Sequence, residues 1–496
     1  PPPPPPPPPP HIPSPRRNTR SGPQSRGLGD VYKRQARIFE KQRAAYLADP
    51  FPDYRTRIKN LKKLEAILIE NDDAIAEAIS KDFGNRAVQE SKLVDIFLPL
   101  DGLRYNRKKL RKWMKSQRRG TSPWFRPGVN RVLAQPKGVV GVIAPWNYPL
   151  FLVVGPLASA LAAGNRCMVK MASNSQNLCR LFAELVAEKF DEDTLAVLPG
   201  VRASEFTPLP WDHLVFTGSP ESGKTVMKTA AENLTPVTLE LGGKSPTIVC
   251  EDFDLETAAE RILFGKFVNA GQTCVGPDYL FLPEGRMAEF SSLCRDIVAK
   301  RLSGLDDPSY TSIVDEKSFK RLNEWLEDAK QKGASAVNLM PGKESDPALR
   351  KIAPMLVTGV KPDMLVMQEE IFGPLLPVMT YTDINEVLDY VNARERPLAL
   401  YLFTNDKSLQ IRVLKNTISG GVSLNDCVMH AAQHDMPFGG IGNSGMGHYH
   451  GREGFDELSK LRPIFHQSRF TTAPLLYPPY GKIWNSLYKL MIKWPF

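Results

Sequence analysis

The sequence predicts an α/β protein built on a doubly wound parallel sheet. From about Val132 onward, short apolar runs of strand length alternate with longer segments of helical periodicity. This alternation is typical of parallel sheets whose strands are joined by helices. The chain has 496 residues, of which 42% are hydrophobic and 24% charged, so it is long enough for two or three domains around a large core.

The first 35 residues are expected to lie outside this fold. They begin with ten prolines and continue in Ser, Arg, Gly and Pro, a composition that cannot bury a core, so we expect residues 1–35 to be disordered. The run Gly27–Gln35 reads like translated upstream or vector sequence, which favours a non-native leader. A functional Pro-rich ligand segment is the less favoured alternative.

Helical periodicity begins near Ala36 and continues to about residue 119. Leu61, Leu64 and Leu68, for example, repeat on one face, as the core-facing stripe of a helix does. The run 120–127, which is rich in Gly, Ser and Pro, then ends the helices.

The alternating part of the chain falls into two units. In the first unit we expect strands at 139–143, 167–170, 213–216 and 236–241, and helices at 156–163, 178–190 and 221–231. A second α/β unit runs from roughly 243 to 420. Ligands of doubly wound sheets bind at the carboxyl ends of the strands, so we expect the functional residues there.

The charge distribution does not favour a nucleic-acid partner. The net charge is +10, and residues 1–35 supply about half of the excess. A second basic run covers 104–119, with five basic residues at helical spacing: Arg104, Lys108, Arg111, Lys112 and Lys115. This run has few interleaved aromatic residues to stack bases, so it is interpreted as a solvated helix face.

The six cysteines favour a reducing, cytoplasmic location. They are Cys167, Cys179, Cys250, Cys274, Cys294 and Cys427. None forms a CxxC pair or a Cys/His cluster with zinc-ligand spacing, so no bound metal is expected. The sequence has neither a run of 18 apolar residues nor a secretory signal, and a membrane span is not expected.

Cys274 is the first candidate catalytic residue. It lies between Gly271 and Gly276, beside polar Gln272 and Thr273. Small neighbours let a carbonyl approach the sulfur and leave backbone N–H groups free to face an oxyanion. Because the nucleophile is the thiolate, an electropositive setting is expected to lower the pKa of this thiol. A buried structural cysteine is the alternative.

Two further strand ends carry polar candidates. Asn147, framed by Pro145 and Pro149 after a buried strand, has an amide that can donate to an oxyanion; a turn Asn is the alternative. Glu240 ends an apolar strand beside Gly242 and Gly243, which favours a raised pKa and a role as a base. A solvated carboxylate, or a carboxylate that binds a cofactor ribose, are the alternatives.

The run Gly218–Thr225 follows a strand and opens a helix. It matches the phosphate-loop pattern GxxxxGK[ST], which makes a P-loop nucleotide hydrolase the alternative function. The helix start favours phosphate on either interpretation. A hydrolase also needs an acidic residue for magnesium, for which Asp252 is a weak candidate, and the fingerprint GxGxxG of dinucleotide-binding folds is absent.

Taken together, these residues resemble the NAD(P)-dependent aldehyde dehydrogenase superfamily. The resemblance covers nearly everything from about Ala36 onward. It rests on six motifs in the family's order: Pro145-Trp-Asn-Tyr-Pro149, Phe216-Thr-Gly-Ser219, Leu239-Glu-Leu-Gly-Gly-Lys244, Gly271-Gln-Thr-Cys274, Glu369-Glu-Ile-Phe-Gly-Pro374 and Pro437-Phe-Gly-Gly-Ile-Gly-Asn-Ser-Gly445. Within the family, the stretches Cys274–Tyr279 and Ala432–Phe438 are most similar to the coniferyl aldehyde dehydrogenases of the class 3-like branch. The P-loop match then becomes a coincidence of pattern.

The resemblance implies a reaction and a set of roles. Cys274 attacks the aldehyde, Asn147 and the Cys274 N–H hold the oxyanion, hydride passes to NAD or NADP, and Glu240 activates the water that hydrolyses the thioester. An aromatic substrate such as coniferyl aldehyde, or a medium-chain aliphatic aldehyde, is implied. The implied cofactor-binding residues are Trp146, Lys170, Ser173, Gly218, Ser219, Gly223, Glu370 and Phe372.

One departure from the family concerns the choice of cofactor. Many relatives carry a glutamate for the adenosine ribose where this chain has Ser173. A carboxylate repels a 2′-phosphate and a hydroxyl does not, so NADP is expected to be accepted beside NAD.

The resemblance also implies a domain plan and an oligomer. Residues 36–120 and 136–242 would form the cofactor-binding domain, and 243–423 the catalytic domain. Strands at 121–135 and 448–466 would carry the contacts of a homodimer or homotetramer. The amphipathic tail 467–496 would dock on a neighbouring subunit, with weak contact to a membrane surface as the alternative. A catalytically dead relative that acts as a binder is disfavoured, because Cys274, Glu240 and Asn147 are all present.

Overall fold

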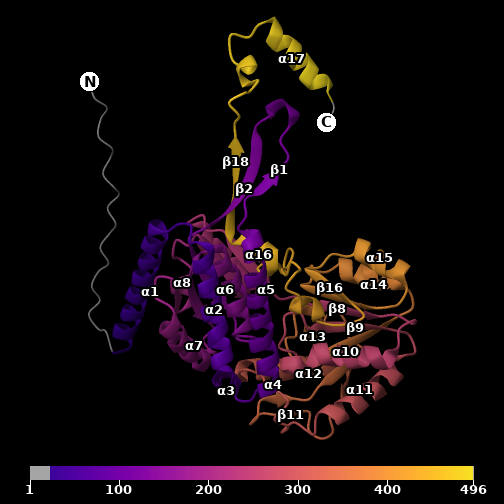
Figure 1. Ribbon diagram of the computed structural model, residues 1–496. Helices are drawn as coiled ribbons and strands as arrows, with labels where there is room; N and C mark the ends of the chain where they lie inside the picture. The colour runs from indigo at the N-terminus through magenta and orange to yellow at the C-terminus, as the bar shows by residue number, and fades with distance from the viewer. Residues whose placement is uncertain (1–22, 495–496) are drawn as a thin grey trace, which may run out of the picture.

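The computed structural model describes residues 23–494 and has the predicted α/β architecture, with two mainly parallel sheets and a projecting arm (Figure 1). Each sheet carries helices on its faces. The carboxyl ends of strands of the first sheet face the amino ends of strands of the second where the two halves of the body meet, and this region holds the candidate site.

The first sheet has six strands in the order β17-β7-β6-β3-β4-β5. Its strands are β3 (Val139–Ala144), β4 (Arg166–Met171), β5 (Leu195–Val197), β6 (His213–Gly218), β7 (Val237–Leu241) and β17 (Gly445–Met446). All are parallel except β17, which pairs antiparallel with β7 and sets Gly445 opposite Glu240. Every residue of β3 is buried, as expected for a strand covered on both faces.

Helices cover both faces of the first sheet. They include α6 (Phe151–Ala163), α7 (Gln176–Lys189), α8 (Ala203–Phe206) and α9 (Pro220–Ala231). The predicted helix 156–163 is five residues too short, because α6 begins at Phe151 and contains Pro156. The cause is a distant cap: one oxygen of buried Asp95 accepts hydrogen bonds from the N–H groups of Leu150 and Phe151, which satisfies donors that the local sequence leaves unpaired.

The second sheet has seven strands in the order β10-β13-β14-β9-β8-β15-β16. They are β8 (Ser245–Val249), β9 (Pro277–Pro283), β10 (Ser335–Asn338), β13 (Met355–Thr358), β14 (Leu375–Tyr381), β15 (Ala399–Phe403) and β16 (Gly421–Leu424). Around them lie α10 (Leu255–Phe267), η3 (Val268–Gly271), α11 (Met287–Arg301), α12 (Glu316–Gln331), α13 (Leu365–Gln368), α14 (Ile384–Asn392), α15 (Lys407–Asn416) and η4 (Met429–Ala432). A small antiparallel pair, β11 (Ser345–Asp346) with β12 (Lys351–Ile352), lies apart from this sheet. The expected second α/β unit therefore contains its own sheet, separate from the first.

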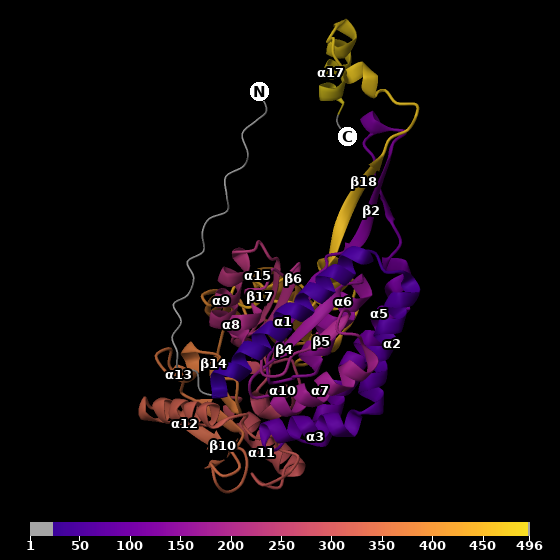
Figure 2. The ribbon, with the colours of Figure 1, turned by 90° about the vertical axis from the view of Figure 1, so that its left-hand side faces the viewer.

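The N-terminal helices pack on the half of the body that holds the first sheet (Figure 2). They are α1 (Pro23–Ala48), α2 (Tyr54–Glu70), α3 (Asp72–Phe83), α4 (Val88–Glu90), the π-helix η1 (Ser91–Phe97) and α5 (Leu98–Trp113). Helix α1 contacts β3 and β4, and α2, α3 and α5 pack on α6 and α7. The five basic residues expected on a solvated face, on and just after α5, are all exposed.

The prediction that residues 1–35 are disordered is wrong for residues 23–35, which are helical. Residues 1–22 lie outside the described residues, but α1 already begins at Pro23. The buried Gln35 side chain donates to the Glu205 carbonyl at 2.6 Å. Contacts of this kind to residues far along the chain cannot be seen in the composition of the segment.

The arm is a three-stranded antiparallel sheet that projects from the body (Figures 1 and 2). It consists of β1 (Gln117–Arg119), β2 (Val129–Pro136) and β18 (Ser459–His466), and η2 (Pro123–Phe125) lies in the connection between β1 and β2. Residues 451–457 form a short helix, α16 (Gly451–Glu457), so the expected strand 448–466 is limited to its second half. Beyond β18, η5 (Ala473–Leu476) and α17 (Lys482–Lys493) end the described chain, and α17 has no buried residue. Among helices within residues 23–494, none is long and apolar enough to cross a membrane.

Candidate active site

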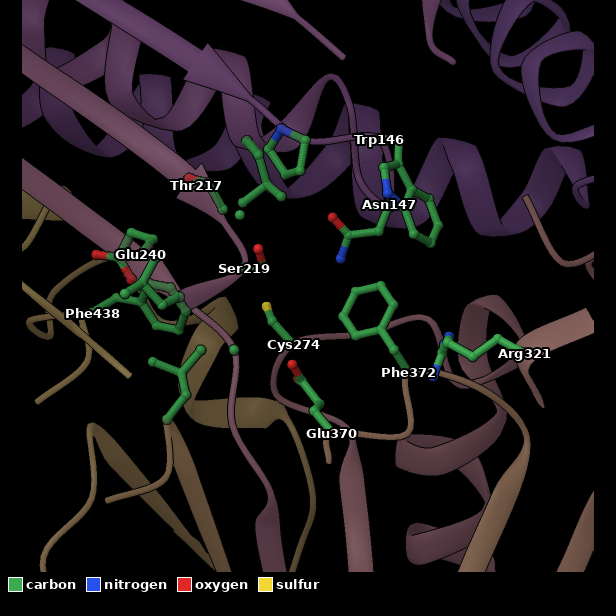
Figure 3. Close-up of a pocket in the computed structure, with 16 residues that line it drawn as sticks. Trp146, Asn147, Thr217, Ser219, Glu240, Cys274, Arg321, Glu370, Phe372 and Phe438 are labelled. Carbon is green, nitrogen blue, oxygen red and sulfur yellow. The ribbon is translucent and has the colours of Figure 1, made fainter. Parts of the chain in front are cut away.

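The site is a cavity of about 270 Å³ at the junction of the two sheets. It collects residues that follow β3, β6 and β7 of the first sheet, together with the loop before β9 of the second (Figure 3). Eight of the predicted site residues line it: Trp146, Asn147, Gly218, Ser219, Glu240, Cys274, Glu370 and Phe372.

Cys274 stands at the end of a strained backbone segment. Asn269 and Ala270 have φ values of 55° and 51°, and Gly271 follows at 78°. Left-handed backbone is costly for residues with a side chain, and such strain gathers at functional sites. A side chain at Gly271 would put its Cβ 2.2 Å from the Gly373 carbonyl oxygen. The predicted need for small residues around Cys274 therefore has a structural cause.

The sulfur of Cys274 points into the cavity, with Asn147 and Glu240 on opposite sides of it (Figure 3). Burial, and then the charges of Glu370 and Glu240, raise the pKa of this thiol to about 12. The expected electropositive setting is thus wrong for the protein without ligand. Positive charge has to enter the cavity with a ligand if the thiol is to lose its proton near neutral pH.

Asn147 is held through its main chain and its side chain. Its carbonyl accepts hydrogen bonds from Arg86 Nη1 at 3.1 Å and from Asn269 Nδ2 at 2.9 Å, and its own amide donates to the Gln272 carbonyl at 3.2 Å. Arg86 is fully buried and also pairs with Asp95 at 3.0 Å. These bonds tie the loop after β3 to the loop that carries Cys274.

Glu240 is a buried carboxyl group that forms no hydrogen bond with the described residues 23–494. It lies in β7, is 2% exposed, and neither of its oxygens has a hydrogen-bond partner. Burial raises its pKa well above the usual value, which confirms the expected direction. The alternative of a solvated strand-end carboxylate is wrong. A buried carboxyl group with a raised pKa is suited to exchange a proton with a neighbouring water or thiol.

Glu370 and Phe372 come from the segment between α13 and β14. Burial, and then the charge of Asp278, raise the pKa of Glu370 to about 8. The Phe372 ring meets the Trp146 ring edge-on, with centroids 5.4 Å apart. Phe372 also has a left-handed φ of 49°, so the backbone is strained on this side of the cavity too.

Three predicted cofactor residues do not line the cavity. Lys170 lies in β4 beside Ile143 of β3, and burial lowers its pKa. Ser173 is exposed just after this strand, and Gly223 is buried in α9 against Leu241. All three remain at or near the carboxyl edge of the first sheet, outside the part of the site that surrounds Cys274.

A second cavity, of about 280 Å³, reaches Cys274 from another side. Its wall is almost entirely apolar. The hydroxyls of Tyr148 and Thr273 bond to each other at 2.6 Å, and no charged side chain of the described chain lines it. The lining residues are Leu93, Val94, Leu98, Tyr148, Phe151, Leu152, Phe264, Val268, Thr273, Cys274, Val275, Val428, Met429, Ala431, Ala432 and Phe438.

This geometry agrees with the comparison to known proteins. The model of the aldehyde dehydrogenase family matches residues 41–464. The chain belongs to the aldehyde dehydrogenase family. It is therefore an enzyme that oxidises aldehydes with NAD or NADP.

Individual members of the aldehyde dehydrogenase family are similar over almost the whole chain. A probable coniferyl aldehyde dehydrogenase of Pseudomonas aeruginosa is 51% identical over 462 residues, which cover 92% of this chain and 96% of the relative. A coniferyl aldehyde dehydrogenase of a Pseudomonas species is 42% identical over 459 residues, or 91% and 95% of the two chains. The substrate-bound structure of Staphylococcus aureus AldH matches with a TM-score of 0.86 at 35% identity, over 92% and 99%.

The cavity fits the cofactor of an aldehyde dehydrogenase. Ser219 caps α9, whose free N–H groups at the helix start suit a pyrophosphate. Gly242 lets the Glu370 carboxyl approach the backbone, because a Cβ there would lie 2.1 Å from Glu370 Oε2. Aromatic Trp146 and Phe372 line the same cavity.

The P-loop alternative finds no support. Lys224 pairs with Glu221 at 2.7 Å on the surface of α9, and Thr225 Oγ1 donates to the Glu221 carbonyl. Asp252, the weak magnesium candidate, accepts hydrogen bonds from the Thr404 hydroxyl and from the backbone N–H groups of Asn405 and Asp406. Gly218–Thr225 is instead the β6–α9 turn of an aldehyde dehydrogenase.

Sequence reasoning missed several residues of the cavity wall, Arg321 and Phe438 among them. Arg321 lies on α12 and donates to the Ile371 carbonyl at 2.9 Å. No motif marks it, because its place depends on how α12 packs. Phe438 lines both cavities and belongs to the motif Pro437–Gly445, so its position was visible in the sequence while its function was not.

Proposed function

We propose that this protein oxidises an apolar aldehyde, aromatic like coniferyl aldehyde or medium-chain aliphatic, to the carboxylic acid through a thioester on Cys274. The observation that carries the proposal is the position of Cys274 between two unlike cavities. One cavity holds Glu240, Asn147 and the family's cofactor residues, and the other is apolar. An aldehyde whose apolar group fills the second cavity brings its carbonyl carbon to the sulfur.

In the first step the Cys274 thiol loses its proton to water, and the thiolate sulfur attacks the aldehyde carbon to form a thiohemiacetal oxyanion. The Asn147 amide and the Cys274 N–H then donate hydrogen bonds to the new oxyanion. The amide of Asn147 has a second N–H beside the one given to Gln272. The ties of its main chain to Arg86 and Asn269 keep it in place.

The second half of the reaction depends on Glu240. The bound nicotinamide ring supplies the hydride acceptor, which leaves a thioester on Cys274. Glu240 then takes a proton from a water molecule, and the hydroxide attacks the thioester carbon and releases the acid and the thiol. Because Glu240 has no hydrogen-bond partner in the described part of the chain, its oxygens are available to bind that water.

The cofactor is held by the edge of the first sheet. Lys170 and Glu370 bind ribose hydroxyls, Phe372 and Trp146 pack at the nicotinamide end, and Gly218, Ser219 and the start of α9 face the pyrophosphate. Gly223 lets α9 approach β7 closely, since a Cβ there would meet the Leu241 side chain at 2.7 Å. Residues 36–120 and 136–242 act as the cofactor-binding domain, and 243–423 as the catalytic domain.

The relatives named for coniferyl aldehyde support an aromatic substrate. The apolar cavity supports the same class, because burial of a charged aldehyde there would leave its charge unpaired. A planar aryl chain also suits a wall that includes Tyr148, Phe151, Phe264 and Phe438.

The arm supports assembly into a homodimer or homotetramer. β18 is exposed along almost its whole length, and an open strand edge is suited to pair with another chain. The tail 467–494 docks on the neighbouring subunit. Weak contact with a membrane surface is the alternative, which the lysines and aromatic residues of α17 favour.

A spectrophotometric screen tests the proposal. Aromatic, aliphatic and charged aldehydes are incubated with NAD and with NADP, and reduced cofactor is followed. We expect turnover with apolar aldehydes, at least tenfold weaker turnover with charged ones, and none in Cys274→Ala, which still binds cofactor. Single replacements of Cys167, Cys179, Cys250, Cys294 or Cys427 serve as controls. Preference for charged aldehydes, or turnover by Cys274→Ala, would refute the proposal.

A further inference from the structure

A buried ion pair behind the cavity joins three segments of the site. Lys244 lies four residues after Glu240, and Asp278 lies four residues after Cys274. The Lys244 Nζ is 2.5 Å from Asp278 Oδ2, and the two side chains are 13% and 4% exposed. This ion pair thus links the chain segment that follows Glu240 directly to the segment that follows Cys274.

The same pair holds the backbone of the third segment. Lys244 Nζ also donates to the carbonyls of Val366 and Glu369, each at 2.8 Å, which uses all three ammonium protons. The second oxygen of Asp278 accepts from the Ile371 N–H at 2.9 Å. The segment 366–371 is therefore bonded at three backbone groups immediately around Glu370.

This segment is buried in the core at Val366 and Ile371, but its backbone is largely irregular. α13 has only four residues, and the backbone at Phe372 is left-handed. From the other side, Arg321 donates to the Ile371 carbonyl. The Glu370 carboxyl lies directly over Gly242, within the loop that joins Glu240 to Lys244. A shift of the Lys244–Asp278 pair would move Glu370 and Phe372 relative to that loop.

We propose that Lys244 and Asp278 are positioning residues that set Glu370 and Phe372 for the cofactor. The proposal rests on the cofactor roles proposed above for Glu370 and Phe372. Stability alone is a weak reason for such a pair, since buried ion pairs are often replaceable by apolar residues without loss. The pair also makes three hydrogen bonds to the segment 366–371, so its loss is expected to change the position of that segment.

The test is cofactor binding, measured by calorimetry with NAD alone, so that no turnover is needed. In Asp278→Asn, the amide still accepts from Ile371 but no longer offers a charge to Lys244. We expect at least a tenfold weaker cofactor affinity in Asp278→Asn and in Lys244→Met. The KM for aldehyde should change less than twofold, and Lys244→Arg should recover part of the affinity. Lys330→Met, which breaks the exposed Lys330–Glu344 pair at 2.7 Å, is the matched control and should bind like the wild type.

The double variant Lys244→Met/Asp278→Leu removes the pair without leaving a buried charge. It is expected to fold, as judged by circular dichroism. It is also expected to bind cofactor as weakly as the single variants, because all three variants lose the same Lys244–Asp278 ion pair. Wild-type affinity in the folded double variant would overturn the proposal. If wild type binds NAD but Cys274 proves dispensable, the proposed reaction fails while the positioning proposal is still decided by these affinities.

Discussion

The pKa values of Cys274 and Glu240 depend on the charge of the ligands that bind beside them. Burial raises the pKa values of both groups, and the thiol is raised further by the carboxyl groups of Glu370 and Glu240. Burial and these carboxyl groups therefore favour the protonated thiol in the free protein. A cofactor with a positively charged nicotinamide would oppose this shift. The reactive state of the site thus depends on what occupies it, which the sequence alone did not indicate.

At the same scale, Ser173 is expected to decide cofactor choice. Its hydroxyl does not repel a 2′-phosphate, and Lys170 lies on the adjoining strand. We expect activity with both cofactors, at kcat/KM values within about two orders of magnitude, equivalent to about 2.7 kcal/mol. Ser173→Glu should shift the ratio toward NAD, and Ser173→Ala should not. Wild-type inactivity with NADP, or an unchanged ratio in Ser173→Glu, would contradict this.

At the scale of elements, the loop before Cys274 is expected to tolerate no side chain at Gly271. Gly271→Ala would strain a φ of 78° and drive its Cβ against the Gly373 oxygen. We expect at least a tenfold loss of kcat/KM, about 1.4 kcal/mol. Gly285→Ala is the matched control: its φ is 82°, but nothing lies within 4 Å of the new Cβ. Equal activities of the two variants would show that the close approach to Gly373 is unimportant.

The contacts of α9 distinguish a dinucleotide-binding turn from a P-loop. Lys224 points to Glu221 on the surface, and the start of the helix needs no lysine to bind a pyrophosphate. We expect Lys224→Ala to keep more than half of the dehydrogenase activity. Hydrolysis of ATP is expected to be absent from both proteins. Magnesium-dependent ATP hydrolysis that disappears in Lys224→Ala would count against this account of the turn.

The elements that sequence reasoning placed well are those with strong local signals. The strand β3 is a continuous apolar run and β4, β6 and β7 are rich in apolar residues, and all four lie within two residues of their expected bounds. The start of α6 was misplaced because its cap, Asp95, comes from another helix. In the site, Asn147, Glu240 and Cys274 stand in marked motifs, whereas Arg321 enters the cavity only through the packing of α12.

At the scale of the whole molecule, Glu240 is expected to make stability depend on pH. Its folded pKa is raised, so its stabilising contribution is full below the unfolded pKa of about 4.3 and is lost as pH rises toward the folded value. Glu240→Gln removes this penalty. The free energy of unfolding of Glu240→Gln relative to wild type should therefore increase from pH 5 to pH 8, by up to about 1.4 kcal/mol per pH unit, and its relative melting temperature should rise with it. A constant difference in melting temperature would contradict the raised pKa.

The central claim is that Cys274 carries the acyl group and Glu240 releases it. The most direct measurement is rapid mixing of Glu240→Gln with aldehyde and cofactor, followed by mass spectrometry of the quenched protein. We predict a burst of reduced cofactor close to one equivalent per site, slow steady turnover, and an acyl adduct on the peptide that contains Cys274. Normal steady turnover without an adduct would contradict the claim and would favour a role for Glu240 in cofactor binding alone.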